Sequence, residues 1–208
     1  MEKNNKKIGI IDYQSCNVKS LQNSLVKLGY KSDLIANFKN IKKYDKVILP
    51  GVGSFESAIN LLNKYCFKNY ICEFLSNKKN KLLGICLGMQ LLFNSSEEGR
   101  NKKKVEGLKI LDGDVKIFSK SKKIMNMGWS KIVKNNNFSL INNIDEKNFY
   151  FVHGFYCSTK KNYKNTISFF NNVKFISSVE HKNIFGVQFH PEKSSYSGLK
   201  LLKNFCQL

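Results

Sequence analysis

The sequence has almost no arginine. Arg100 is the only one among 35 basic residues, although the chain of 208 residues carries a formal net charge of +20. Base readout and phosphate contacts favour arginine, because its planar guanidinium makes two hydrogen bonds at once. The lysines are spread along the chain among many asparagines. We therefore interpret the charge as a solvated lysine surface and expect no nucleic-acid partner; a non-enzymatic lysine-rich binding domain stays open as an alternative.

Long apolar runs and closely spaced cysteine pairs are also missing. No run is long enough to span a membrane, and residues 8–11 are too few for the apolar part of a signal peptide. We therefore expect a cytoplasmic protein without a membrane partner. None of the six cysteines forms a C-x-x-C pair, which argues against structural zinc, and the lack of a secretion signal argues against disulfides. Since no linker is apparent, we expect a single domain over residues 1–208.

Apolar runs and helical patterns alternate in the first half of the chain. The runs cover residues 7–13, 31–36, 45–51 and 81–86, and we expect helices over residues 17–30, 55–76 and 87–99. Uninterrupted apolar runs are typical of parallel strands buried on both faces. Short β-rich segments follow at 113–118, 129–134, 148–157, 166–170, 174–181 and 183–190, before a last helix over 197–208. The predicted fold class is α/β: an open, mostly parallel sheet with flanking helices and an antiparallel β-rich extension.

One cysteine stands where a buried strand meets a helix. The segment Gly84-Ile85-Cys86-Leu87-Gly88 has the G-x-C-x-G layout of a nucleophile elbow, in which small neighbours permit a tight turn. A thiol at a helix N-terminus is held more readily as thiolate, and the Leu87 N–H can face a developing oxyanion. A buried cysteine in an ordinary glycine-flanked turn is the alternative interpretation.

A nucleophilic cysteine needs a base, and the sequence has only three histidines. His190 is followed two residues later by Glu192, so in an extended segment both side chains lie on one side and the carboxylate can orient the imidazole. His153, at the end of an apolar run, is equally compatible with a hydrogen-bonded strand-end histidine. His181 lies in a polar, turn-like context and is expected at the surface.

A second glycine-rich turn follows the strand over residues 45–51. The segment Pro50-Gly51-Val52-Gly53 is expected at the same edge of the sheet as the elbow. Its glycines would let the backbone approach a ligand, and the N–H of Gly53 is a candidate oxyanion donor beside that of Leu87. An ordinary strand-to-helix turn is the alternative.

These three segments resemble the class I glutamine amidotransferases, and among them the glutaminase subunits of imidazole glycerol phosphate synthase. The resemblance rests on "PGVGSF", "GICLGMQLL" and "GVQFHPEKS", with "MGW" and "YFVH" between them. It implies a Cys86–His190–Glu192 triad that hydrolyses glutamine to glutamate and ammonia without a metal or cofactor. It also implies roles for a further set of residues. Gly51, Gln90, Glu98, Gly154 and Phe155 would bind the substrate, and Trp129 and Lys193 would lie at a partner interface.

The implied partner is a (β/α)₈-barrel cyclase subunit, in a heterodimer that makes imidazole glycerol phosphate and aminoimidazole carboxamide ribotide for histidine biosynthesis. The sequence departs from the family at Gln14 and Cys16, where glycines are usual, and at Asn126, where histidine is usual. Gly154-Phe155 stands where a hydroxyl residue and a tyrosine are common. Three alternatives stay open beside the lysine-rich binding domain: a subunit serving a nitrogen-containing surface-sugar pathway, a γ-glutamyl hydrolase and a peptidase.

Overall fold

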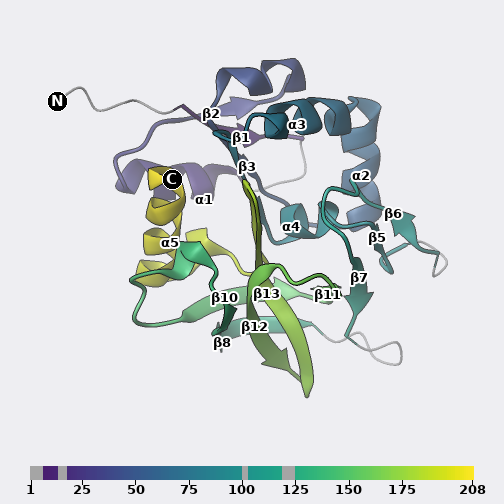
Figure 1. The fold of residues 1–208 in the computed structure, drawn as a ribbon, viewed down its shortest axis with the longest axis vertical. Coiled ribbons are helices and arrows are strands. Elements are labelled where there is room, and N and C mark those ends of the chain that lie inside the picture. The colour runs from purple at the N-terminus through teal and green to yellow at the C-terminus, as the bar shows by residue number, and fades with distance from the viewer. Residues whose placement is uncertain (1–6, 14–17, 100–102, 119–124) are drawn as a thin grey trace.

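The computed structural model describes residues 7–13, 18–99, 103–118 and 125–208, and the elements named here lie in these ranges (Figure 1). Five strands form the parallel region: β1 (Ile8–Ile11), β2 (Ser32–Ile35), β3 (Lys46–Leu49), β4 (Lys81–Ile85) and β14 (Ile184–Val187). They lie in the order β2-β1-β3-β4-β14 and pair in parallel throughout. The four strands expected in the first half of the chain are therefore confirmed.

Helices cover both faces of this region. Figure 1 shows α1 (Val18–Lys27) and α5 (Ser195–Gln207) on one side, and α2 (Phe55–Lys64), α3 (Phe67–Ser76) and α4 (Leu87–Leu91) on the other. Successive residues of each central strand supply one core or the other: Val47 packs with the α2–α3 side and Ile48 with the α1–α5 side. Burial on both faces explains why these strands read as uninterrupted apolar runs. Short 3-10 helices complete the set: η1 (Phe38–Lys43), η3 (Ser139–Ile141) and η4 (Pro191–Lys193).

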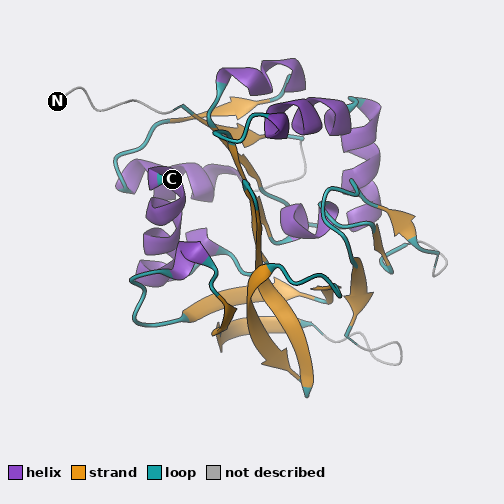
Figure 2. Cartoon of the chain, viewed as in Figure 1, coloured by secondary structure: helices purple, strands orange, loops and turns teal. Residues whose placement is uncertain are grey.

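The second half of the chain adds the β-rich extension, and Figure 2 shows most of its strands at one end of the molecule. Its strands are β5 (Ser95–Ser96), β6 (Val105–Glu106), β7 (Asp114–Ile117), β8 (Asn126–Lys131), β9 (Val133–Asn136), β10 (Asn148–His153), β11 (Phe155–Ser158), β12 (Lys164–Phe170) and β13 (Val173–His181). Of these, β5 and β6 lie at the side, beside α2 (Figure 1). Most continue the main sheet beyond β14, and β8 pairs antiparallel with β10 in a separate two-stranded sheet. The predicted α/β class with an antiparallel extension is confirmed.

Strand β14 differs from the expectation for this half of the chain. We expected the segment over residues 183–190 among the antiparallel additions, but β14 pairs in parallel with β4 and antiparallel with β13. A tight turn at Lys182, with φ of 55°, reverses the chain after β13. The direction of β14 therefore follows from this turn. Its four residues are all buried, as befits an interior strand.

The predicted helix over residues 55–76 is broken into α2 and α3. Cys66 lies in the left-handed region, with φ of 53° and ψ of 32°. Leu62 is the last buried residue of α2 and Phe67 the first of α3. In one continuous helix, five residues would turn Phe67 well away from the buried stripe, because each turn takes about 3.6 residues. The break therefore restores the apolar face in α3.

The predicted helix over residues 87–99 is also too long. Helix α4 ends at Leu91, and the next carbonyls are bonded by a later segment: Leu108 donates to Leu91, and Ile110 donates to Leu92, both at 2.9 Å. The chain then enters β5, which pairs with β6 and β7. Tertiary contacts thus override the local helical pattern.

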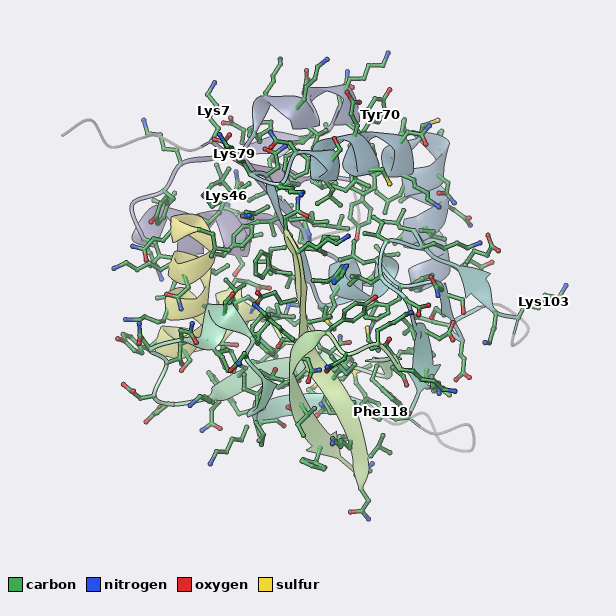
Figure 3. All side chains as sticks on the ribbon, in the orientation of Figure 1. Lys7, Lys46, Tyr70, Lys79, Lys103 and Phe118 are labelled. Atoms are coloured by element: carbon green, nitrogen blue, oxygen red, sulfur yellow. The ribbon has the colours of Figure 1, made fainter. Side chains whose placement is uncertain are left out.

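Most of the lysine side chains lie at the surface of the molecule. Lys103, for example, projects at the periphery in Figure 3. Lys46 on β3 is an exception and is buried. Among the helices that the structure describes, none combines the length and the apolar character that a membrane crossing requires.

The break at Cys66 gives a stability prediction. Cys66→Gly should raise the free energy of unfolding by about 0.5–1 kcal/mol, because glycine adopts the left-handed conformation without the steric penalty of a Cβ atom. Cys72, also exposed but inside α3, is the matched control. Cys72→Gly should lower the same quantity by about 0.3–0.5 kcal/mol. Urea denaturation of both variants measures the effect, and equal destabilisation by the two would contradict it.

Candidate active site

Cys86 lies at a strained turn between β4 and α4. Its φ of 53° and ψ of −112° are unusual for a residue with a side chain. A Cβ atom at Gly84 would come within 2.8 Å of the Met89 backbone, and one at Gly88 would come within 1.8 Å of the Leu49 carbonyl oxygen. Both glycines are therefore required sterically. The predicted elbow geometry is present.

The β3–α2 turn packs directly against this elbow. A Cβ atom at Gly51 would lie 2.9 Å from the nitrogen of Gly88, so the two turns share one tightly filled space. The Tyr13 hydroxyl donates to the carbonyl of Pro50 at 3.1 Å and supports the turn from β1. Gly53 has φ of 93°, a conformation that glycine adopts without strain.

His190 and Glu192 form a buried pair. Nδ1 of His190 lies 2.8 Å from Oε1 of Glu192. The pair is not made in an extended segment, as the sequence suggested, because Pro191 starts the 3-10 helix η4 directly after His190. The Ser194 hydroxyl stabilises this turn by donating to the His190 carbonyl at 2.6 Å and accepting from the Tyr150 N–H at 2.9 Å.

The imidazole of His190 also lies beside the thiol. Burial alone lowers the pKa of His190, but interactions with Cys86 and Glu192 outweigh burial and raise its pKa to about 10. Nε2 of His190 and Oε2 of Glu192 are buried without a hydrogen-bond partner among the described residues. Cys86 therefore lies close to the imidazole without a hydrogen bond to Nε2. The 2.8 Å hydrogen bond between Nδ1 and Glu192 raises the pKa of His190. These interactions favour the protonated imidazolium form of His190.

Cys86 and His190 open onto a cavity of about 510 Å³. Six other predicted residues line it: Gly53, Leu87, Gln90, Glu98, Gly154 and Phe155. Gly51, Glu192 and Lys193 line an adjoining space of about 20 Å³, which shares Val52 and His190 with the larger one. A cavity of equal volume between η1 and α3 is lined by neither Cys86 nor a histidine. The large cavity at Cys86 is therefore the candidate active site.

Glu98 brings a carboxylate to this cavity. Burial raises the pKa of Glu98, and a hydrogen bond from the Phe55 N–H, at 3.2 Å, opposes that rise. Phe55 is the first residue of α2, so Glu98 caps the positive end of that helix dipole.

His153 is a hydrogen-bonded histidine at the end of a strand, which is one of the two interpretations that the sequence allowed. Its Nδ1 lies 2.7 Å from the Phe155 carbonyl and its Nε2 lies 3.0 Å from Nδ2 of Asn126. The carbonyl can only accept, so Nδ1 carries the proton and Nε2 accepts from Asn126. Burial lowers the pKa of His153 to about 4, although the Phe155 bond opposes this shift. The ring is therefore a neutral part of the cavity wall.

The remaining predicted positions are Trp129, in the β-rich extension, and two residues outside the described ranges. Trp129, on β8, is 56% exposed and packs edge-on against Tyr150 of β10, with ring centroids 6.2 Å apart. The predicted strand over residues 148–157 divides at Gly154 into β10 and β11. Gln14 and Cys16 lie outside the described residues.

Sequence reasoning missed three residues that contact the site. Gln188 donates to the Cys86 sulfur, the Val152 carbonyl accepts from the thiol, and Ser194 holds η4. Gln188 and Ser194 both lie in the quoted segment "GVQFHPEKS", and Gln188 stands two residues before His190; these are the signals that could have drawn attention to them.

His153 gives a pH prediction. Its folded-state pKa of about 4 is below the ordinary value of 6.5, so its stabilising effect is present above pH 6.5 and is lost as the pH falls towards 4. The stability advantage of wild type over His153→Gln should shrink by about 2–3 kcal/mol between pH 7 and pH 4. Denaturant titrations at each pH measure it. His181→Gln, at the end of β13, is the surface control, and an equal pH dependence there would contradict the assignment.

Comparisons with known proteins show the family of the chain. A family model for class-I glutamine amidotransferases matches residues 9–208. The chain is 42% identical to the imidazole glycerol phosphate synthase subunit HisH 2 of Methanococcus maripaludis, over 95% of this chain and 98% of that protein. It is 40% identical to subunit HisH of Sulfurimonas denitrificans, over 95% and 96% of the two chains.

Solved structures share the fold. A putative GMP synthase subunit from Thermoplasma acidophilum superposes with a TM-score of 0.71 at 17% identity, over 97% of this chain and 92% of that one. A glutamine amidotransferase of Thermotoga maritima gives a TM-score of 0.65 at 16% identity, over 98% and 83%. At these identities the likeness concerns the fold alone.

Proposed function

Because the chain belongs to the class-I glutamine amidotransferase family, we propose that it is the glutamine-hydrolysing subunit of imidazole glycerol phosphate synthase, and that it supplies ammonia to a cyclase partner in histidine biosynthesis. One observation carries the chemical part of the proposal: an elbow cysteine and a histidine line one cavity, and a buried carboxylate is hydrogen-bonded to that histidine from behind. Nucleophile, base and orienting acid are the elements that acyl transfer requires.

In the proposed reaction the Cys86 thiolate attacks the side-chain amide carbon of glutamine. The resulting oxyanion accepts hydrogen bonds from the N–H groups of Leu87 and Gly53, a contribution of roughly 10²–10³ in rate for each donor. His190, held by Glu192, protonates the departing ammonia. It then takes a proton from the water that hydrolyses the γ-glutamyl thioester, which releases glutamate and restores the thiolate.

The rest of the cavity fits the amino-acid end of the substrate. Glu98 offers a carboxylate to the α-ammonium group, and the backbone at Gly154 and Phe155 offers N–H groups to the α-carboxylate. Both amide hydrogens of Gln90 are engaged, at 3.0 Å each, by the Phe155 carbonyl and Gln188. Gln90 therefore presents only its oxygen to a substrate, which suits an ammonium or amide donor.

The proposed partner surface is the outer side of β8. Met127 and Trp129 are 63% and 56% exposed there, and Val52, in the turn beside the cavity, is 43% exposed. Exposed apolar side chains at a cavity mouth are typical of a protein interface. Lys193, in η4, lines the small space behind Val52 and adds a positive charge. We propose that a (β/α)₈-barrel cyclase subunit covers this surface in a heterodimer and receives ammonia before water protonates it.

The division of labour gives the main prediction. Cys86→Ser should abolish product formation from glutamine by the complex with the cyclase, yet preserve product formation from ammonium salt at alkaline pH, where free ammonia exists. The substitution removes the nucleophile but leaves the β8 surface unchanged. Product assays of the reconstituted pair with the two nitrogen sources measure this, and wild-type chain alone should hydrolyse glutamine poorly.

Three results would contradict the proposal. A bound Cys86→Ser complex that fails with ammonia as well would show that the substitution damages more than glutamine hydrolysis. Full glutaminase activity of the isolated chain would favour a free-standing γ-glutamyl hydrolase or peptidase. Salt-dependent RNA binding without glutaminase activity would instead favour the lysine-rich binding domain.

The base and its orienting acid give a second functional prediction. His190→Ala should lower glutaminase kcat by at least about 10³-fold, because His190 is the imidazole beside the thiol, whereas both ring nitrogens of His153, the other described histidine at the cavity, are engaged elsewhere. Glu192→Gln should retain a measurable part of the activity, because it degrades the orientation of the imidazole without removing it. His181→Ala, at the end of β13, is the control and should match wild type. Loss of activity in the control, or full activity in His190→Ala, would overturn the assignment.

A further inference from the structure

We infer that Gln188 is a positioning residue for the nucleophile: its side-chain NH₂ group donates to the Cys86 sulfur, and Gln90 holds its amide in the orientation that makes this possible. The inference deepens the proposed function and rests on it, because it concerns the same thiol. The evidence is a chain of hydrogen bonds in which a backbone carbonyl, which can only accept, fixes the donor and the acceptor of each bond.

The sheet places Gln188 beside the elbow. Val187, the last residue of β14, pairs with Ile85 of β4, and the Cys86 N–H donates to the Val187 carbonyl at 2.8 Å. Gln188 follows directly, is completely buried, and is fixed through its own N–H, which donates to the Ser177 carbonyl at 2.9 Å. Its side-chain nitrogen lies 3.8 Å from the Cys86 sulfur, within range for a hydrogen bond to sulfur.

The direction of the Gln188 amide follows from a fixed acceptor. The Phe155 carbonyl can only accept, so Gln90 must direct its NH₂ group towards it, at 3.0 Å. The second hydrogen of this group lies towards Oε1 of Gln188, also at 3.0 Å. With its oxygen so engaged, Gln188 has only its NH₂ group for Cys86. His153 anchors the same carbonyl through Nδ1, at 2.7 Å.

Two groups therefore have opposite effects on the protonation of the Cys86 sulfur. The Val152 carbonyl, at 3.8 Å, accepts from the neutral thiol and favours it. The Gln188 NH₂ group can only donate, so it favours the thiolate. Gln188 thus shifts the balance towards the ionised nucleophile. Because Gln90 holds Gln188, the same contact joins a proposed substrate-binding side chain to the reacting atom.

The test is the pH dependence of Cys86 alkylation by iodoacetamide, followed by peptide mass mapping in the full chain. Gln188→Met keeps most of the volume but loses the donor. It should alkylate about tenfold more slowly at neutral pH, as expected when a modest hydrogen bond to a charged atom is lost. The rates should converge at high pH, where the thiol is ionised in every variant. A merely structural role would not move the profile along the pH axis.

Further variants keep the test decisive. Gln188→Glu retains an acceptor for Gln90 but sets a negative charge beside the sulfur, so its profile should move further in the same direction. Gln90→Met should produce a smaller shift, because the Gln188 amide is then free to rotate. Asn183→Leu is the matched control: this buried amide donates to three backbone carbonyls at the end of α3 and in the loop before β4, at the opposite end of that strand from Cys86. Its alkylation profile should match wild type.

An unmoved profile in the Gln188 variants, or an equal shift in Asn183→Leu, would overturn the inference. The proposed function fails separately, when Cys86→Ser keeps glutamine-dependent product formation. If Cys86→Ser is inactive with glutamine and Gln188→Met alkylates like wild type, only the role of Gln188 is wrong. In the complex with the cyclase, Gln188→Met should lower kcat for glutamine about tenfold and leave ammonia-dependent synthesis unchanged, since only the first depends on the thiolate.

Discussion

Close packing between two strand-to-helix turns is the constraint on which the rest of the site depends. The backbone of Gly88 lies so close to the Leu49 carbonyl that no Cβ atom fits, and Gly51 is similarly pressed against the elbow. This contact holds Cys86 in a conformation that a non-glycine residue adopts only when its surroundings compel it. It also sets the β3–α2 turn beside the thiol. The elbow and the proposed oxyanion turn are therefore one steric unit.

The insertion of β14 beside β4 completes this unit. Because β14 runs parallel to β4, both strands end at the same edge of the sheet, and the residues after each end lie next to one another. Cys86 follows one strand, and Gln188, His190 and Glu192 follow the other. The turn of η4 then brings Glu192 back to the imidazole, where an extended chain would have continued past it. Parallel pairing at this one position is what assembles the proposed triad.

The elements that can be predicted from the sequence are those with a local steric or periodic cause. The glycines around Cys86, the buried parallel strands and the nearness of Glu192 to His190 belong to this group. The parallel direction of β14 could not be predicted from its apolar run, because the pattern of apolar residues in a strand does not indicate the direction of the neighbouring strand. The lengths of α3 and α4 depend on contacts made elsewhere in the chain. Gln188 lies inside the segment "GVQFHPEKS", but the motif does not indicate a role for it, which follows only from the amides and the sulfur that the fold places around it.

The late position of β14 in the chain bears on how the protein is made. Gln188 lies 102 residues after Cys86, and the imidazole and its carboxylate come later still. At a translation rate of about 5–20 residues per second, the thiol is synthesised several seconds before the groups that would ionise it. During that interval the growing chain presents an ordinary cysteine without a base. If the proposed triad is the catalytic one, glutamine hydrolysis can therefore begin only after β14 and η4 have been synthesised.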